Sequence, residues 1–242
     1  MLIELAGIPV EVKCRYPKNE EFLGDYVTDR QPLMSIAVTD EDLEKMQADF
    51  DRMDIAEGRQ PRKRSDAFLE NNAIHAQLAE KLVEHNILLV HGSALCMDGK
   101  AYIFMAPSGT GKSTHTRLWR EVYGDRVWMI NDDKPMLKIE ETGTAVCGTP
   151  WDGKHHLSRN ASAPLEAFVY LTRDTHNHIE PMSSADAFPV LMKQAYGSYS
   201  PVTMLKILEL QIQLLNTVGF YKLGCNMEPE AAQVAYETLS SR

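Results

Sequence analysis

The chain has 242 residues, of which 44% are hydrophobic and 24% are charged, and its formal net charge is −9. This composition is typical of a globular protein with one large domain or two smaller ones. The negative charge argues against non-specific binding to nucleic acid or to an anionic membrane, so an anionic ligand would need a local site.

The first 86 residues predict a small region of strands and helices. The expected elements are strands within 2–14 with a turn at Gly7-Ile8-Pro9, a strand at 33–38, and helices at 39–53 and 67–85. Thr39 and Asp40 can cap the first helix at its acidic end. The second helix carries Ile74, Leu78 and Leu82 at four-residue spacing, which predicts one buried face.

A polar break with a cluster of cations separates these two helices. Its sequence is EGRQPRKRSD, residues 57–66, and its cations are Arg59, Arg62, Lys63 and Arg64. The segment is either a solvated connector or a docking patch for an acidic partner. Because runs of charge are usually solvated, we favour the connector.

From residue 87 onward the pattern predicts a mixed sheet with covering helices. The expected strands are 87–90, a hairpin over 93–105 that turns at Asp98-Gly99, 127–130, a pair around 135–147, 167–171 and 220–223; the expected helices lie near 184–195, near 202–217 and from Pro229. Hairpins combined with crossover helices favour a mixed sheet over a purely parallel one. We therefore expect an α/β fold in two parts, an N-terminal region at 1–86 and a larger domain at 87–242.

The stretch YIFMAPSGTGKST, residues 102–114, carries the pattern of a P-loop (Walker A), with Ala106 in place of its first glycine. Gly109 and Gly111 can adopt backbone angles that turn successive N–H groups inward to form an anion nest. Lys112 can neutralise phosphates, and Ser113 can bind Mg²⁺. The residues expected to hold the nucleotide are Ser108, Gly109, Thr110, Gly111, Lys112, Ser113 and Thr114, and the expected cofactors are ATP and Mg²⁺.

Two adjacent carboxylates, Asp132 and Asp133, follow the apolar strand at 127–130. Successive side chains of an extended segment point to opposite sides, so one carboxylate can hold the metal while the other faces the acceptor hydroxyl as a base. A solvated turn at the end of a strand is the alternative. The P-loop upstream favours the functional interpretation.

The segment GTPWDGKHHLSRN, residues 148–160, combines four cationic or imidazole side chains, which are Lys154, His155, His156 and Arg159. It is either a substrate loop or a plain surface loop. A metal site is the weaker interpretation of its two histidines, because no further ligand lies at suitable spacing. His91, at the end of the strand at 87–90, is either a core residue or a functional one.

The four cysteines, Cys14, Cys96, Cys147 and Cys225, have no CxxC spacing and predict free thiols in a reducing compartment. The N-terminal residues lack the pattern of a signal peptide, and no apolar run approaches the length of a membrane span. We therefore expect a cytoplasmic protein.

In order and spacing, three segments resemble the catalytic domain of the HPr kinase/phosphorylase family, whose P-loop fold is shared with phosphoenolpyruvate carboxykinase. They are HGSALCMDGKAYIFMAPSGTGKST, INDDKP and GTPW, and the resemblance covers roughly residues 87–240. It implies an HPr-kinase/PEP-carboxykinase-like mixed β-sheet core with flanking helices. It also implies that Ser113 and Asp133 flank Mg²⁺, that Asp132 is the base for the acceptor hydroxyl, and that His91 lies on the phosphate side.

The chain also departs from this family. It has no match to the signature segment that accompanies phosphorolysis, and the family's N-terminal regulatory domain is not evident in residues 1–86. The resemblance thus implies an ATP- and Mg²⁺-dependent kinase that phosphorylates a hydroxyl, with serine in a small molecule, peptide or protein as the expected acceptor. The alternatives are a non-catalytic nucleotide-binding regulator and, disfavoured by chain length, a carboxykinase-like lyase. The expected partners are a nucleotide and a hydroxyl-bearing acceptor, with no nucleic acid and no membrane; a homo-oligomer is left open.

Overall fold

The computed structural model describes residues 1–194 and 200–241 and divides into two compact units, Met1–Lys81 and Leu82–Arg242. The expected helix end at 195 and most of the expected connector at 197–201 lie outside the described residues. That 1–86 and 87–242 are separate domains stays a prediction from the sequence.

The first unit contains a three-stranded sheet in the order β1 (Leu2–Leu5), β2 (Ile8–Lys13) and β3 (Met34–Ala37). The turn between β1 and β2 is Ala6-Gly7, with φ angles of 50° and 83°. Two-residue turns with positive φ match the twist of a hairpin. The expected turn at Gly7-Ile8-Pro9 is therefore wrong by one position, since Ile8 and Pro9 already pair with β1.

Three helices complete this unit: α1 (Pro17–Phe22), α2 (Asp40–Ala56) and α3 (Asp66–Lys81). Thr39 and Asp42 form a capping box at the start of α2, with Asp42 N donating to Thr39 Oγ1 at 3.2 Å and Thr39 N donating to Asp42 Oδ2 at 2.8 Å. Ile74 and Leu78 of α3 are buried as expected. The last turn of the expected helix, Leu82–His85, is a 3₁₀ helix.

The polar break at 57–66 is a connector in which two of the cations, Arg59 and Arg64, pair with Asp54; Arg59 Nε donates to Asp54 Oδ1 at 3.1 Å. Arg64 donates to the buried carboxylate of Asp54 at 2.7 Å, and its guanidinium lies 4.5 Å from the ring centroid of Phe50. Arg62 and Lys63 are exposed. The sequence pattern did not separate Arg64, which ties the connector to α2, from its exposed neighbours.

The second unit is built on a nine-stranded mixed sheet, as expected from the sequence. Its strands are β4 (Ile87–Leu89), β5 (Ser93–Met97), β6 (Lys100–Met105), β7 (Val127–Asn131), β8 (Met136–Glu140), β9 (Gly143–Cys147), β10 (Ser162–Arg173), β11 (His178–Pro181) and β12 (Gly219–Cys225). The order is β4-β8-β9-β10-β6-β5-β7, with β12 paired to β10 and β11. β6 and β12 run parallel to β10, and the other neighbours are antiparallel.

β10 is the longest strand and joins two parts of this sheet. Residues 162–164 pair with β9, and the residues from Leu165 onward pair with β6 and β12. A change of register lies between Leu165 and Ala167. The expected strand at 167–171 covered only its apolar centre.

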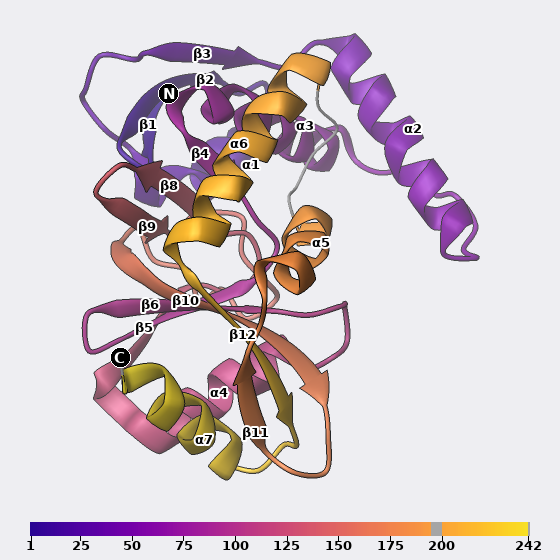
Figure 1. Cartoon of the computed structure of the whole chain (residues 1–242). Helices are drawn as coiled ribbons and strands as arrows, with labels where there is room; N and C mark the ends of the chain where they lie inside the picture. Colours follow the sequence, from indigo (N-terminus) through magenta and orange to yellow (C-terminus); the bar gives the residue numbers. More distant parts are fainter. Residues whose placement is uncertain (195–199, 242) are drawn as a thin grey trace. The chain divides into compact units, whose positions relative to one another are not determined.

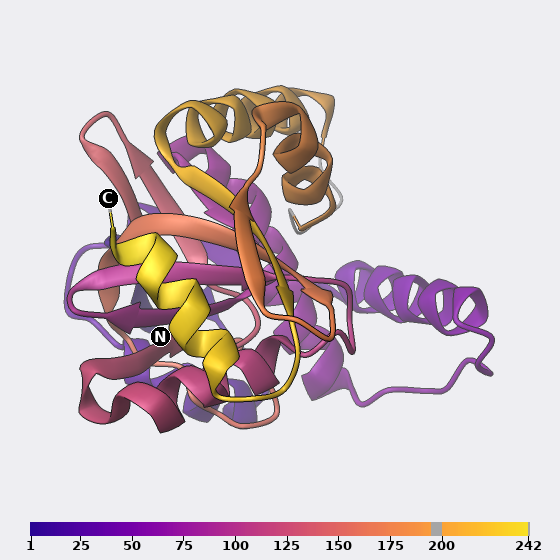
Figure 2. The ribbon, with the colours of Figure 1, turned by 60° about the horizontal axis from the view of Figure 1, so that its bottom comes forward.

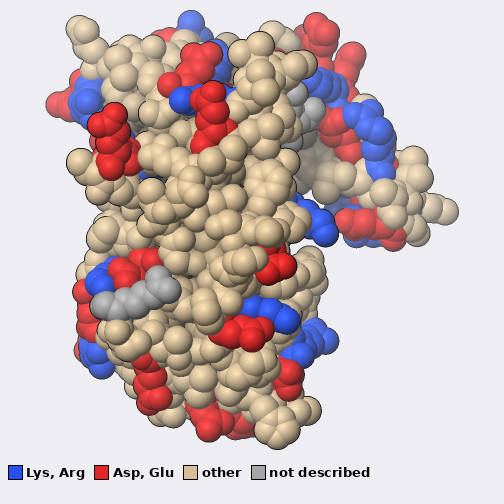
Figure 3. All heavy atoms as spheres, in the orientation of Figure 1, with Lys and Arg blue, Asp and Glu red and all other residues tan. Residues whose placement is uncertain are grey.

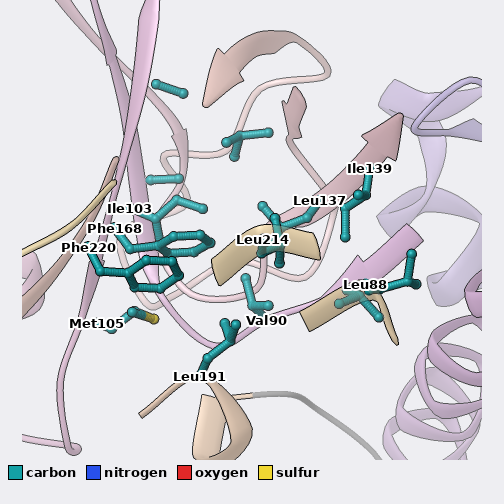
Figure 4. Packing of buried hydrophobic residues seen from close by; sticks show 14 of the residues in the cluster. Leu88, Val90, Ile103, Met105, Leu137, Ile139, Phe168, Leu191, Leu214 and Phe220 are labelled. Carbon is teal, nitrogen blue, oxygen red and sulfur yellow. The ribbon is translucent and has the colours of Figure 1, made fainter. Parts of the chain in front are cut away.

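The helices α4 (Lys112–Tyr123), α5 (Ser184–Gln194), α6 (Pro201–Thr217) and α7 (Glu230–Ser240) cover the two faces of the sheet. α4 and α7 lie side by side on one face, and α5 and α6 cover the other (Figures 1 and 2). Because successive side chains of β6 point to opposite faces of the sheet, Ile103 faces α5 and α6, and Phe104 faces α4 and α7. Phe168 and Phe220 stack in the core between the sheet and α5 and α6, with ring centroids 4.7 Å apart (Figure 4).

Two further expectations are confirmed, the hairpin turn in this unit and the free cysteines of the chain. The hairpin from β5 to β6 turns at Asp98-Gly99, where both residues have positive φ, and Arg126 donates to the Asp98 carboxylate at 2.6 Å. All four cysteines are free thiols. No helix in the described ranges is long and apolar enough to cross a membrane. On the face seen in Figure 3, acidic and basic side chains are interspersed.

We predict that Phe168→Ala lowers the free energy of unfolding by about 3–5 kcal/mol, because the side chain is fully buried and its removal leaves a cavity. Denaturant unfolding measures this loss. Met227→Ala, at a side chain that is 75% exposed, is the control and should change stability little. Equal effects of the two substitutions would contradict the packing described for this core.

Candidate functional site

A glycine-rich loop connects the carboxyl end of β6 to α4. Gly109 and Gly111 have φ angles of 76° and 124°, which residues with a side chain rarely adopt. α4 begins at Lys112, directly after the second glycine, so the positive end of its dipole faces the loop. Strand, glycine turn and helix thus follow one another in the order required for an anion-binding loop.

The predicted nucleotide-binding side chains lie along this loop and the first turn of α4. Ser108 is exposed, and Thr110 closes a turn by donating its N–H to Pro107 O at 3.2 Å. Ser113 is exposed, and Thr114 is half-buried. The hydroxyl of Ser113 is therefore accessible in the first turn of the helix, where a P-loop needs it.

The side chain of Lys112 folds back onto the loop. Its Nζ donates to Ala106 O at 2.9 Å, at the position where the motif has its first glycine. Burial lowers the pKa of Lys112, and the nearby charge of Asp133 offsets only part of that effect. Lys112 is thus a half-buried cation within electrostatic reach of Asp133.

Asp133 is surrounded by basic side chains from three segments of the chain, His91, Lys112 and Lys134. Its Oδ1 lies 3.3 Å from His91 Nε2, and its Oδ2 lies 3.8 Å from Lys134 Nζ. Burial would raise the pKa of Asp133, but the hydrogen bond with His91 and the charges of Lys134 and Lys112 outweigh it, so the pKa falls below its ordinary value. This carboxylate stays ionised, which suits a metal ligand.

Asp132 has a different environment. The carboxylate is buried, and its Oδ1 accepts a hydrogen bond from Gly153 N at 2.6 Å. Its Oδ2 has no hydrogen-bond partner within the described residues. Burial raises the pKa of Asp132, and the charges of Asp152 and Asp133 add to this effect against the Gly153 hydrogen bond.

Buried Asn131 fixes the two carboxylates and the following loop in one network. Its Oδ1 accepts from the backbone N–H groups of Asp133 at 2.8 Å and Lys134 at 2.6 Å. Its Nδ2 donates to Thr149 O at 3.0 Å, to Thr149 Oγ1 at 3.1 Å and to Trp151 O at 3.3 Å. This role was not predicted from the sequence, in which an amide side chain at the end of an apolar strand is its only signal.

Three glycines near the site are required by close packing. A Cβ on Gly92 would lie 2.8 Å from the Ile103 side chain, and one on Gly148 would lie 1.9 Å from Arg159 O. On Gly153, a Cβ would lie 2.7 Å from Asp132 Oδ2. The glycine of the His91-Gly92 pair therefore lets the backbone pass against β6, and Gly153 lets the loop reach the carboxylate.

The 148–160 segment is held by contacts within itself and with β7, one of which reaches His156 at its tip. Asp152 accepts a hydrogen bond from Ser158 Oγ at 3.0 Å and pairs with His156 Nδ1 at 3.0 Å. The guanidinium of Arg159 lies 5.7 Å from the ring centroid of Trp128.

The four predicted substrate-loop side chains are not gathered at the carboxylates. Lys154, His155 and His156 are exposed at the tip. Within the described part of the chain, no hydrogen bond or ion pair joins these three side chains or Arg159 to Asp132, Asp133 or Lys112. Contact with a substrate stays a prediction for this group; within the loop, Gly153 donates to Asp132 and the charge of Asp152 acts on Asp132.

Comparison with known proteins gives distant similarity in fold to solved structures only. No known family and no curated protein matches the sequence. Among solved structures, the Hpr(Ser) kinase/phosphatase from Coxiella burnetii is similar at a TM-score of 0.37 and 10% sequence identity, over 62% of this chain and 95% of that one. The roles of the residues above therefore rest on their own geometry.

We predict that Asn131→Ala and Asn131→Asp have different local effects. Alanine leaves the amides of Asp133 and Lys134 unpaired, at about 1–3 kcal/mol for each buried group, so hydrogen exchange at both should accelerate. Aspartate keeps an acceptor for those two amides but loses the donors to Thr149 O and Trp151 O. Its faster exchange should be confined to 149–153, whereas alanine, which also loses those donors, should accelerate exchange in both segments; identical exchange maps for both variants would contradict the network.

Proposed function

We propose that the chain is an ATP- and Mg²⁺-dependent phosphotransferase that transfers the terminal phosphoryl group to a hydroxyl. The observation that carries the proposal is the contrast between two adjacent carboxylates beside one P-loop. Asp133 lies among basic side chains and has a lowered pKa, whereas Asp132 is buried with a raised pKa and one oxygen without a hydrogen-bond partner in the described chain. Carboxylates with pKa values moved apart by their surroundings are suited to different roles.

The residues present fit Mg²⁺ bound together with phosphate. Within the described residues, no group of three or more His, Cys, Asp or Glu side chains could hold a metal by itself. Mg²⁺ usually takes one or two protein oxygens and completes its shell with phosphate and water. Asp133 and Ser113 would supply those oxygens, and the ion would neutralise charge on the phosphates.

Each side chain then has one task. Lys112 would leave Ala106 O and pair with the phosphates, and His91 would keep the Asp133 carboxylate oriented through their 3.3 Å contact. The acceptor oxygen forms a bond to the terminal phosphorus as the bond from that phosphorus to the bridging oxygen breaks, leaving ADP. Asp132 Oδ2 would take the proton of the acceptor hydroxyl.

The acceptor is expected to be serine, free or within a peptide or protein. A transfer screen with γ-labelled ATP against free serine, related polyols and candidate peptides encoded by neighbouring genes tests this. Transfer to any hydroxyl supports the proposal. Nucleotide binding without transfer to any acceptor would favour a nucleotide-binding regulator.

We predict that Lys112→Ala loses about 1.5–3 kcal/mol of affinity for ATP, because a charge-assisted contact to phosphate disappears. Calorimetry with ATP and Mg²⁺ measures the change. Lys206→Ala, at a surface lysine on α6 that pairs with Glu209, is the control. Wild-type affinity in Lys112→Ala would show that the loop does not bind phosphate.

Asp132→Asn and Asp133→Asn should separate catalysis from binding. In Asp132→Asn, the oxygen of the new side-chain amide can still accept from Gly153 N. This variant should therefore bind ATP normally and lose about 10²–10⁴-fold in transfer rate. In Asp133→Asn, Mg²⁺-dependent affinity and transfer should both fall. ATP titration with and without Mg²⁺, beside single-turnover transfer, distinguishes the two.

The pH dependence gives a further test of Asp132. A base acts only when deprotonated, and the pKa of Asp132 is raised above its ordinary 3.8. Transfer by the wild type should therefore fall with decreasing pH at a value above 3.8, and this limb should be missing from the residual activity of Asp132→Asn. An unchanged limb or a wild-type rate in that variant would rule out Asp132 as the base.

A further inference from the structure

A pocket outside the carboxylate cluster lies between the P-loop and the carboxyl end of β10. Its volume is about 410 Å³, within the range of roughly 300–1,000 Å³ that is typical of small-ligand sites. It is lined by Pro107, Ser108, Gly109 and Thr110 from the loop and by Tyr170, Leu171, Thr172 and Arg173 from β10. Neither the P-loop motif nor the proposed transfer step accounts for the β10 side of this pocket.

Arg173 ties the two walls of the pocket together. Its Nη2 donates to Gly109 O at 2.6 Å, and its Nε donates to Thr110 O at 3.4 Å. Because a trans peptide carries its C=O and N–H on opposite sides, the N–H of Gly111 then points away from Arg173. Arg173 thus fixes the orientation of the peptide groups between Gly109 and Gly111, which form the phosphate-binding cradle of the loop.

The order of the strands indicates on which side of the bound phosphates this pocket would lie. β7 and β10 lie on opposite sides of the P-loop strand β6, and all three run the same way, so their carboxyl ends share one edge of the sheet. Asp133 follows β7, and its charge acts on Lys112. A nucleotide whose terminal phosphate lies between Lys112 and Asp133 therefore extends its other end toward β10.

We propose that the pocket at the end of β10 binds the base and ribose of the nucleotide, and that Arg173 positions the P-loop beneath them. The proposal rests on the phosphotransferase function above and adds the site that distinguishes a nucleotide from a bare polyphosphate. The half-buried ring of Tyr170 and the side chain of Thr172 supply the mixed apolar and polar lining that nucleoside sites use.

The test compares ATP with inorganic tripolyphosphate, which carries the phosphates without a nucleoside. Thr172→Phe fills the pocket and leaves the P-loop sequence intact. By calorimetry with Mg²⁺, it should weaken ATP binding by about tenfold or more and leave tripolyphosphate binding unchanged. Lys112→Ala should weaken both ligands, and Glu180→Phe, at an exposed position of β11, should weaken neither.

Arg173 variants test the positioning role. Arg173→Met should weaken both ligands, because both use the cradle, and Arg173→Lys should recover part of the loss since an ammonium can still bond one carbonyl. Unchanged binding in Arg173→Met, or no recovery in Arg173→Lys, would overturn this role.

The outcomes separate this inference from the function on which it rests. If the wild type binds ATP and tripolyphosphate but Thr172→Phe weakens both equally or neither, the nucleoside does not lie at β10 and the inference fails alone. If the wild type binds neither ligand, the phosphotransferase proposal fails with it. Photolabelling of the wild type with 8-azido-ATP needs no substitution: label within 107–110 or 170–173 supports the site, and label confined to other peptides overturns it.

Discussion

The side chain of Asn131 is the constraint on which the rest of the candidate site depends. It is fully buried at the end of β7 and holds two backbone N–H groups on one side and two backbone carbonyls on the other. Asp132 and Asp133 lie inside the turn that this amide closes, and Gly153 lies just beyond the segment to which it donates. The hydrogen bonds of a buried amide matter more to stability than those of an exposed one, because each buried group left without a partner carries a full desolvation cost.

The strand order places the glycine-rich loop in the middle of the sheet edge formed by the carboxyl ends of β7, β6 and β10. β6 lies between β5 and β10, so groups from β7 and from β10 reach the loop from opposite sides. Ligands of open α/β sheets bind outside the carboxyl ends of such strands. Lys112 and Arg173 both donate hydrogen bonds to carbonyl groups of this loop. Because Lys112 belongs to α4 and Arg173 to β10, the loop is held by the sheet as well as by its own sequence.

The sequence predicted the local parts of this arrangement because their causes are local. The P-loop, the hairpin turn at Asp98-Gly99 and the cap at Thr39 depend on residues a few positions apart. It predicted only the apolar centre of β10, since the ends of that strand are defined by pairing with β9 and β12. The link from Asn131 to Thr149 and the role of Arg173 could not be predicted, because these partners lie 18 and 64 positions away.

The two carboxylates show how adjacent residues of one type acquire opposite properties. Both are removed from water, which by itself disfavours charge on each. The pKa of Asp133 is nevertheless lowered, because Asp133 pairs with His91 and lies near the charges of Lys134 and Lys112. The pKa of Asp132 stays raised, because Asp132 accepts one backbone hydrogen bond and lies near the negative charge of Asp152. Both residues lie in the bend that follows β7, so this contrast needs no separate elements to produce it. The backbone of the bend places Asp133 near His91 and Lys112, and Asp132 against Gly153.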